Sequence, residues 1–290
     1  MNLNRFLALM ILAGNVVAGN AWGALASCTI TPSPLTLSGP YTGANLNLQG
    51  VFNINCSRTG NPHTYTLWVE TDQNAGQTLA KLAPYADTLS YGVFSDSGYT
   101  NLWTSGVGGI QVSLTFVGNN LNASVSPAPP FYMRVASGQT DKAAGTYNNT
   151  LNVTVKDTNT SGATLGSTQL ASQATVAKSC SFTVPSYSLT YQAFRSTALV
   201  DTSQSVAVTC SKGTLYDLTL DNTVGVIPGV QLTYGLVFTS SSGASVSSTS
   251  STGNTAQTMG LTLTLPSGQA GACAAGSCLG SGTRQITMTF

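Results

Sequence analysis

Apolar residues recur at every second position along most of this chain, which is the spacing of a β-strand with one buried face. Residues 65–69 and 216–220 are two clear runs of this kind. Gly and Pro interrupt the pattern often, and Thr and Val are frequent within the runs, so short antiparallel strands are favoured over helices. The pattern predicts an all-β protein.

The same landmarks occur twice along the chain and in the same order. Each copy holds a cysteine pair, a Ser after the second cysteine, an alternating strand, a Tyr-Gly strand and a final strand introduced by Gly-Thr. The landmarks are Cys28, Cys56, 65–69, 89–94 and 145–155 in the first copy and Cys180, Cys210, 216–220, 232–238 and 282–290 in the second. We interpret each copy as an immunoglobulin-like antiparallel β-sandwich of about seven strands, with a disulfide joining an early strand to a later one.

The length of 290 residues exceeds the usual size of one such sandwich and suits two. We expect a signal peptide at 1–26, a first sandwich at 27–160 and a second sandwich at 179–290. Residues 161–178 are rich in Thr, Ser, Gly and Ala. They form either a linker or the last strand of the first sandwich.

The N-terminus has the order of a secretory signal peptide. Arg5 is followed by an apolar run over 6–18 and then by small residues, with cleavage expected after Ala26. The run is shorter than a membrane span, so we expect the mature protein to be soluble or assembled outside the cytoplasm. Processing as a lipoprotein at Cys28 is the alternative, and it would leave an odd number of cysteines for pairing.

Charge and candidate chemistry argue against several classes of function. Only 7% of the residues are charged and the net charge is +1, so the chain has no electrostatic footprint for nucleic acid. The one histidine, His63, lies beside a proline in a predicted loop, and Glu70 and Asp72 are the only close carboxylates. Cys273 and Cys278 lack the spacing of a zinc site and are expected to close a small loop by a disulfide. The sequence therefore predicts a binding or assembly protein, with no enzymatic activity, metal or other cofactor.

Together these landmarks resemble the spore coat protein U domain, the fold unit of pilins in archaic chaperone-usher pili. The resemblance covers nearly the whole mature chain, once per copy. It rests on the cysteine pairs, the Tyr-Gly strands at Tyr91 and Tyr234, the following Trp103 and the final strand. The second copy departs from the pattern, because a Ser/Thr/Gly stretch over 240–253 stands where a tryptophan would follow.

The resemblance implies an assembly mechanism. In such pili each subunit is an incomplete sandwich that is completed first by a periplasmic chaperone and then, at the outer-membrane usher, by a donor strand of the adjacent pilus subunit. The second copy fits an acceptor of this kind, because its final strand ends at the chain terminus with Ile286, Met288 and Phe290 on one face. We expect these residues to contact the chaperone or donor strand.

The N-terminal end suggests the place in the fibre. Cleavage after Ala26 leaves only Ser27 before Cys28, too little for a strand that could be donated. The chain would then accept a strand without donating one, as the two-domain tip adhesin of archaic pili does. We therefore expect the first sandwich to be complete, with a last strand drawn from 164–176.

The resemblance also implies attachment to abiotic or host surfaces through exposed apolar loops of the first sandwich. Three stretches are candidates, and the residues selected are Pro84, Tyr85, Val107, Ile110, Pro129, Pro130, Phe131 and Tyr132. Trp103, as part of the family pattern, is expected in the core.

Two alternatives stay open at this point. A surface or spore-coat protein would use the same domain and would fold without a chaperone. A carbohydrate-binding tip would stack sugars on exposed aromatic side chains. The aromatic residues available for such stacking are Tyr85, Tyr99, Phe131 and Tyr132.

Overall fold

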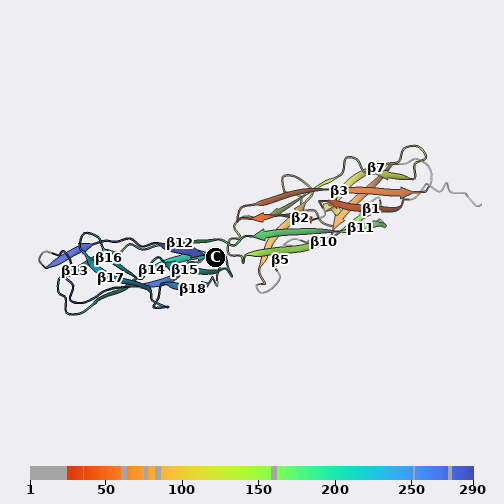
Figure 1. Cartoon of the computed structure of the whole chain (residues 1–290). Helices are drawn as coiled ribbons and strands as arrows, with labels where there is room; N and C mark the ends of the chain where they lie inside the picture. Colours follow the sequence, from red (N-terminus) through yellow and green to blue (C-terminus); the bar gives the residue numbers. More distant parts are fainter. Residues whose placement is uncertain are drawn as a thin grey trace, which may run out of the picture.

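The structure, a computed structural model of the whole chain, describes residues 25–34, 36–59, 64–74, 78–81, 86–157, 162–250, 252–273 and 276–290. Strands and one short 3-10 turn, η1 (Gly106–Gly108), are the regular elements of these residues. They form two β-sandwiches that lie end to end (Figure 1). The predicted all-β class is confirmed. Within the described ranges, no helix has the length and hydropathy needed to cross a membrane.

The first sandwich is one strongly curled sheet that folds into two layers. Its strands follow the order β1-β3-β9-β6-β5-β10-β11-β2, with β4 attached to β10 and β7 and with β8 attached to β3. The strands are β1 Leu25–Ser33, β2 Thr36–Tyr41, β3 Leu46–Arg58, β4 Thr64–Thr71, β5 Thr78–Lys81, β6 Thr88–Phe94, β7 Ile110–Thr115, β8 Asn122–Ser124, β9 Pro130–Val135, β10 Gly145–Asp157 and β11 Thr164–Val176.

Strand β11 completes the first sandwich from within the chain. It pairs antiparallel with β10 along its length and parallel with β2 on its other side. Its inward side chains alternate with outward ones, and Leu170 and Ala174 are fully buried in the core. Residues 164–176, for which the sequence left a linker and a last strand open, therefore form a strand.

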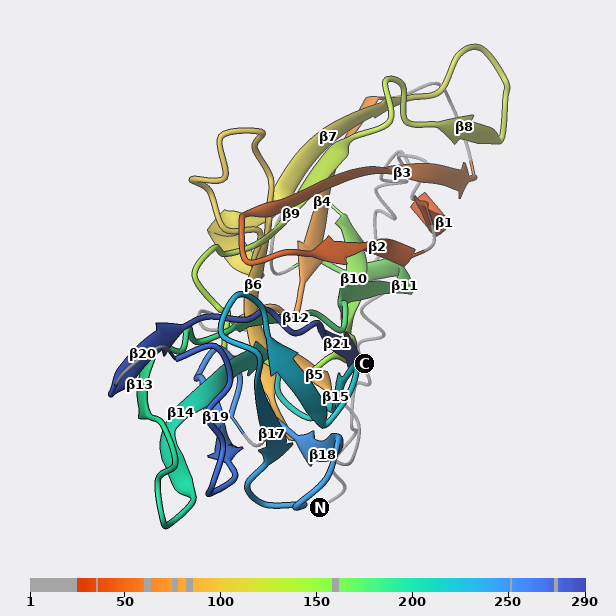
Figure 2. The same cartoon turned by 60° about the vertical axis from the view of Figure 1, so that its left-hand side comes forward.

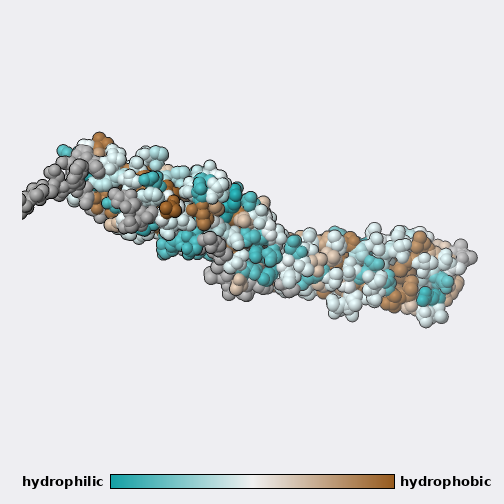
Figure 3. Space-filling view, turned by 180° about the vertical axis from the view of Figure 1, so that it is seen from behind, coloured by the Kyte–Doolittle hydropathy of each residue, from teal (hydrophilic) through white to brown (hydrophobic). Residues whose placement is uncertain are grey.

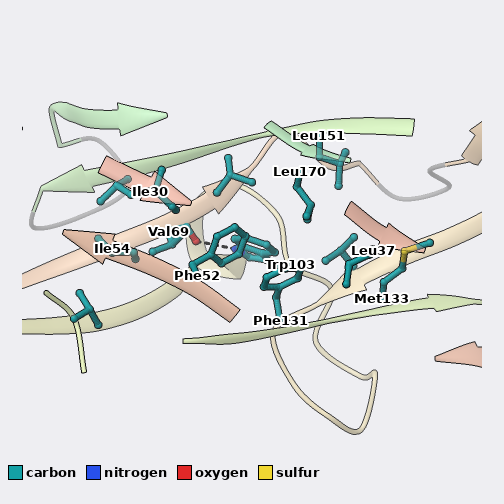
Figure 4. Close-up of a cluster of buried hydrophobic side chains, with 14 of the residues drawn as sticks. Ile30, Leu37, Phe52, Ile54, Val69, Trp103, Phe131, Met133, Leu151 and Leu170 are labelled. Carbon is teal, nitrogen blue, oxygen red and sulfur yellow. Dashed lines mark hydrogen bonds between the residues drawn. The ribbon is translucent and has the colours of Figure 1, made fainter. Parts of the chain in front are cut away.

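The core of the first sandwich is built around three aromatic side chains that are all fully buried. The rings of Phe52 and Phe131 stack with centroids 4.3 Å apart, and the ring of Trp103 meets Phe52 edge-on at 5.1 Å. The indole N–H of Trp103 donates to the Val69 carbonyl at 2.7 Å, which satisfies its one polar atom (Figure 4). Trp103 is a core residue, as expected.

The second sandwich repeats most of this architecture. Its strands are β12 Cys180–Thr183, β13 Leu189–Gln192, β14 Leu199–Cys210, β15 Leu215–Leu220, β16 Val224–Ile227, β17 Leu232–Phe238, β18 Ser245–Thr249, β19 Gln257–Leu265, β20 Ser277–Gly280 and β21 Ile286–Thr289. Strands β12, β14, β19, β17 and β16 form one sheet, β18, β15 and β21 a second, and β13 pairs with β20. The ladders β12–β14–β19–β17–β16 and β18–β15–β21 correspond to β1–β3–β9–β6–β5 and β7–β4–β10.

A shared turn supports this correspondence at the level of single residues. The side-chain amide of Gln139 bonds both backbone groups of Ser90, and Gln269 does the same to Thr233. The hydroxyl of Tyr41 donates to the carbonyl at the start of the first turn, and Tyr191 donates to the carbonyl at the start of the second. Strand β13 is therefore the counterpart of β2.

Three disulfides cross-link the chain. Cys28–Cys56 joins β1 to β3 and Cys180–Cys210 joins β12 to β14, so both bonds occupy the same place in the repeat. Cys273–Cys278 closes the short loop that leads into β20. The described residues contain no free cysteine.

An ion pair joins the two sandwiches at their junction. Nζ of Lys212 lies 2.7 Å from Oδ1 of Asp87, and the N–H of Ala143 donates to the other carboxylate oxygen at 2.9 Å. Burial alone would raise the pKa of the Asp87 carboxyl, but Lys212 and the Ala143 N–H hold this pKa below its usual value. The pair is therefore charged at neutral pH and bridges residues far apart in sequence.

Candidate functional site

The two sandwiches differ at one strand position. In the first, β11 lies between β10 and β2, whereas within the described part of the chain β21 pairs only with β15. Strand β13, the counterpart of β2, pairs directly with β20. The place that β11 fills in the first sandwich is thus a groove in the second, closed at one end by the β13–β20 pair.

The register of the ladders shows which residues face this groove. Ile286 lies opposite Leu220, as Val155 lies opposite Val69 in the first sandwich. Alternate residues of a strand share a face, so Arg284, two residues before Ile286, corresponds to Val153, two residues before Val155. In the same way Gly282 corresponds to Leu151. The Gly-Thr pair at Gly282, taken from the sequence as a repeat landmark, is therefore not in register with the Gly-Thr pair at 145–146.

A cavity of about 330 Å³ lies in the groove. Its apolar walls come from the five-stranded sheet, from β13 and from the final strand β21, and they include Leu189, Ile227, Leu236, Leu261, Leu263 and Ile286. Gly282 leaves room that Leu151 fills in the first sandwich, since a Cβ built there would meet nothing closer than the Tyr234 hydroxyl at 3.7 Å. The groove has the shape and lining to receive an extended segment with apolar side chains.

Two polar side chains also line the cavity and hold atoms without partners. The hydroxyl of Tyr187 and Nε of Arg284 are buried, and neither has a hydrogen-bond partner in the described structure. Burial raises the pKa of Tyr187 to about 12, so its hydroxyl keeps its proton at neutral pH. Both groups are donors, and leaving buried donors unpaired is unfavourable.

Apolar surface is also concentrated on the second sandwich. Space-filling atoms coloured brown gather there (Figure 3). Among the described residues, the large hydrophobic side chains of this sandwich that are more than half exposed are Val184, Phe194, Val200, Leu215, Val224, Val226, Leu279 and Phe290. Val184 lines the groove itself. An exposed apolar side chain at such a groove is available to contact an incoming segment.

A second exposed feature lies at the end of the first sandwich farthest from the second. The loop between β7 and β8 projects there (Figure 2), and Val117 and Leu121 within it are 72% and 56% exposed. Arg58, 2% exposed, holds the loop from below by donating to the carbonyls of Gly118 and Asn120. Its guanidinium lies 4.6 Å from the ring centroid of Phe116. The loop therefore presents two apolar side chains on a fixed support.

The family model of the Spore Coat Protein U domain matches residues 20–154 and 166–233, which is more than half of the chain. The chain belongs to the spore coat protein U domain family. The family inferred from the sequence is thus confirmed, and the second matched segment begins within β11. No curated protein matches the chain.

Two of the solved structures that this chain resembles contain a tip adhesion subunit or tip adhesin. One chain of the CsuC–CsuE chaperone–tip adhesion subunit pre-assembly complex, from archaic chaperone-usher Csu pili of Acinetobacter baumannii, is 16% identical with a TM-score of 0.46. That likeness covers 91% of this chain and 98% of that chain. The CupB6 tip adhesin from Pseudomonas aeruginosa is 8% identical with a TM-score of 0.37, covering 92% of this chain and 95% of that chain.

Some of the residues that the sequence assigns to the binding surface of the first sandwich are buried. Phe131 is fully buried in the aromatic core, and Pro129 is buried beside it. Pro130 and Tyr132 are within β9, where Pro130 is exposed and pairs with Val51 and Tyr132 is half-buried. The prediction of an exposed loop at these positions was wrong, because the stretch begins a strand whose alternate side chains enter the core.

The other predicted loop residues have different positions. Val107 is 99% exposed on the 3-10 turn, and Ile110 is half-buried where β7 begins. Pro84 and Tyr85 lie outside the described residues. The sequence analysis did not select the β7–β8 loop as a binding loop. Val117 and Leu121 are separated by polar residues and do not form a recognisable apolar stretch.

The predicted contacts with a chaperone or donor strand lie on β21 and just after it. Ile286 lines the groove, and Met288 is half-buried against the second core. Phe290 follows β21 and is 55% exposed. The sequence did not single out Arg284, although its place two residues before Ile286 on an alternating strand put it on the inward face.

Proposed function

We propose that this chain is the tip subunit of a chaperone-usher pilus, whose first sandwich attaches the bacterium to a surface and whose second joins the fibre by accepting a donor strand. The observation that carries the proposal is the difference between the two sandwiches. One is completed by its own β11, and the other has an apolar groove at the same place. An added strand would pair with the free edge of β21 and would cover the apolar groove at the same time.

The first sandwich supports a position at the tip. Strand β1 is paired with β3 from Leu25 onward, so cleavage after Ala26 would leave it wholly inside the sandwich. Such a subunit accepts a strand but has none to donate, and it ends the fibre. The role calls for export to the periplasm, a chaperone that occupies the groove, an usher and display at the cell surface. It is a binding role that uses no catalytic group, metal or cofactor.

Capture by a chaperone tests the assembly role. When the chain is produced in the periplasm with the chaperone of the same pilus system, we expect a stable one-to-one complex. The chaperone should be released on addition of a pilus subunit that carries a free N-terminal extension. Accumulation of the folded chain alone, with no complex and no uptake of the subunit, would favour the surface-coat alternative. A processed N-terminus well upstream of Cys28 would remove the argument for the tip.

The adhesive surface is proposed at the distal β7–β8 loop. Burying each apolar side chain gains roughly 1.5–3 kcal/mol, so changing Val117 and Leu121 together to Asp should lower attachment to polystyrene at least about tenfold. The same change at Val107 is the matched control, because Val107 is more exposed but precedes β7 at the end of that strand away from the β7–β8 loop. We expect the double variant to remain folded and secreted, because both side chains point into solvent. Normal attachment by the double variant, or a larger loss with Val107→Asp, would move the site away from this loop.

A further inference from the structure

Arg284 stands where the first sandwich has an apolar core residue. Its counterpart by register, Val153, is fully buried in the core of the first sandwich. Ile286, two residues later on the same face, lines the groove, and Arg284 lines it as well. The final strand of the second sandwich therefore presents a cation on the face that receives an incoming strand.

The contacts of Arg284 fix the orientation of its guanidinium group but leave Nε without a partner. One terminal nitrogen donates to the Val224 carbonyl, and the other lies 3.6 Å from a carboxylate oxygen of Asp221. The guanidinium lies over the ring of Tyr234, 5.3 Å from its centroid. Nε is buried without a partner in the described structure, as is the hydroxyl of Tyr187 across the same cavity. Both ends of the guanidinium are anchored, so the side chain cannot easily turn its unpaired donor toward water.

Strand β11 shows which residue of an incoming strand would meet Arg284. Within the first sandwich, Val153 lies directly opposite Thr168 of β11. Directly opposed residues of an antiparallel pair have Cβ atoms about 4.5–5.5 Å apart. A strand that entered the groove in the register of β11 would bring its residue at the Thr168 position against Arg284. An acceptor at that position would satisfy the buried donor, and a cation would be repelled.

We propose that Arg284 selects the strand that enters the groove: the occupant is an extended segment of a neighbouring pilus subunit with an acidic or other hydrogen-bond-accepting side chain opposite Arg284. This inference rests on the proposed function, since it names the chemistry of the strand that the groove accepts. Two features of the groove support it together. Its walls are apolar, which draws in any amphipathic strand, and its unpaired donors distinguish one register and one sequence from others.

The test uses the 13-residue sequence of β11, Thr164–Val176, as a synthetic peptide titrated into the full chain. Three peptides are compared, one with the native Thr168, one with Thr168→Glu and one with Thr168→Lys. The Glu peptide should bind at least about tenfold more tightly than the Lys peptide, with the native peptide between them. In the Arg284→Gln protein this difference should fall below about twofold. Arg134→Gln, which removes an arginine of the first sandwich, is the matched control and should leave the difference unchanged.

The outcomes separate this inference from the function on which it rests. Equal binding of all three peptides, or the same preference in the Arg284→Gln protein, would overturn the role of Arg284 and leave the groove as a strand acceptor. Failure of every peptide to bind the native chain would overturn the acceptor groove itself. A dimer of the chain that dissociates when peptide is added would assign the groove to a second copy of this chain, which would also overturn the proposal.

Discussion

Replacing Phe131 with alanine is expected to destabilise the first sandwich by about 3–5 kcal/mol, the usual cost of removing a large buried aromatic side chain. Phe131 is fully buried and packs on both Phe52 and Trp103, so the cavity left by the change would open at the centre of the core. The measurement is chemical unfolding followed by tryptophan fluorescence. After removal of the signal peptide, both remaining tryptophans, Trp68 and Trp103, belong to the first sandwich.

A control at an exposed position isolates the effect of packing. Val107→Ala changes a side chain that is 99% exposed and should shift the free energy of unfolding by less than about 0.5 kcal/mol. Any loss of adhesion by Phe131→Ala should follow the loss of folded protein. A stable Phe131→Ala protein with weakened attachment would show instead that Phe131 belongs to the binding surface, as the sequence had suggested.

Adding a strand to the second sandwich is expected to raise its melting temperature by roughly 10 °C. The change is a copy of residues 158–176, placed directly after Phe290, so that the copied β11 can fold back along β21 as β11 does along β10. Burying Leu170 of the copy alone should contribute about 2 kcal/mol, and each 1 kcal/mol shifts the melting temperature of a domain this size by about 4–8 °C. Calorimetry should show a higher transition for the second sandwich and an unchanged one for the first.

The matched control is the same added segment with Leu170→Asp in the copy. A charged side chain cannot enter the apolar groove without a large desolvation cost, so this segment should leave the transition of the second sandwich where it was. Equal stabilisation by both segments would mean that the extra residues act elsewhere on the protein. No stabilisation by either would show that the groove does not accept a strand in the register of β11.

Much of the fold could be predicted from the sequence because its signals are local or repeated. Alternation of apolar and polar residues gave the strand at 65–69 and its counterpart at 216–220, which are part of β4 and β15. The two early cysteine pairs occur at matching places in the repeat, and both are disulfides in the structure. For residues 164–176 the sequence predicts either part of a linker or a last strand of the first sandwich, and in the structure they form β11.

The wrong predictions concern residues that suit both an exposed loop and a strand with one buried face. A run of prolines and aromatic residues before Tyr132 reads as a stiff exposed loop, yet Phe131 is the first inward residue of β9. Only the pairing of β9 with β3 and β6 decides which face of that strand is buried. The match between the Gly-Thr pair at Gly282 and the pair at 145–146 was wrong for a related reason. Two dipeptides can agree by chance, whereas the register of the ladders fixes which residues correspond.

The sequence predicts an acceptor strand with Ile286, Met288 and Phe290 on one face, but the lining of the groove and the distal loop could not be predicted from it. The groove becomes visible only when β21 is compared with β10 in their ladders, because the difference is a neighbour that one has and the other lacks. The distal loop depends on Arg58, which reaches Gly118 and Asn120 from about sixty positions earlier in the chain. Arg284 lies on the face that the sequence assigns to Ile286, but its unpaired Nε and the groove around it are visible only in the structure.

Amide hydrogen exchange of the second sandwich tests most directly the claim that this sandwich is completed by an added strand. Exchange is compared between the native chain, the chain with the added copy of residues 158–176 and the chain with the Leu170→Asp copy. The native-sequence copy should slow exchange in β21 and in the segment from β12 to β13 at least about tenfold, while the control copy and the first sandwich show no change. Unchanged exchange in β21 with the native-sequence copy would show that the second sandwich is not completed by an added strand.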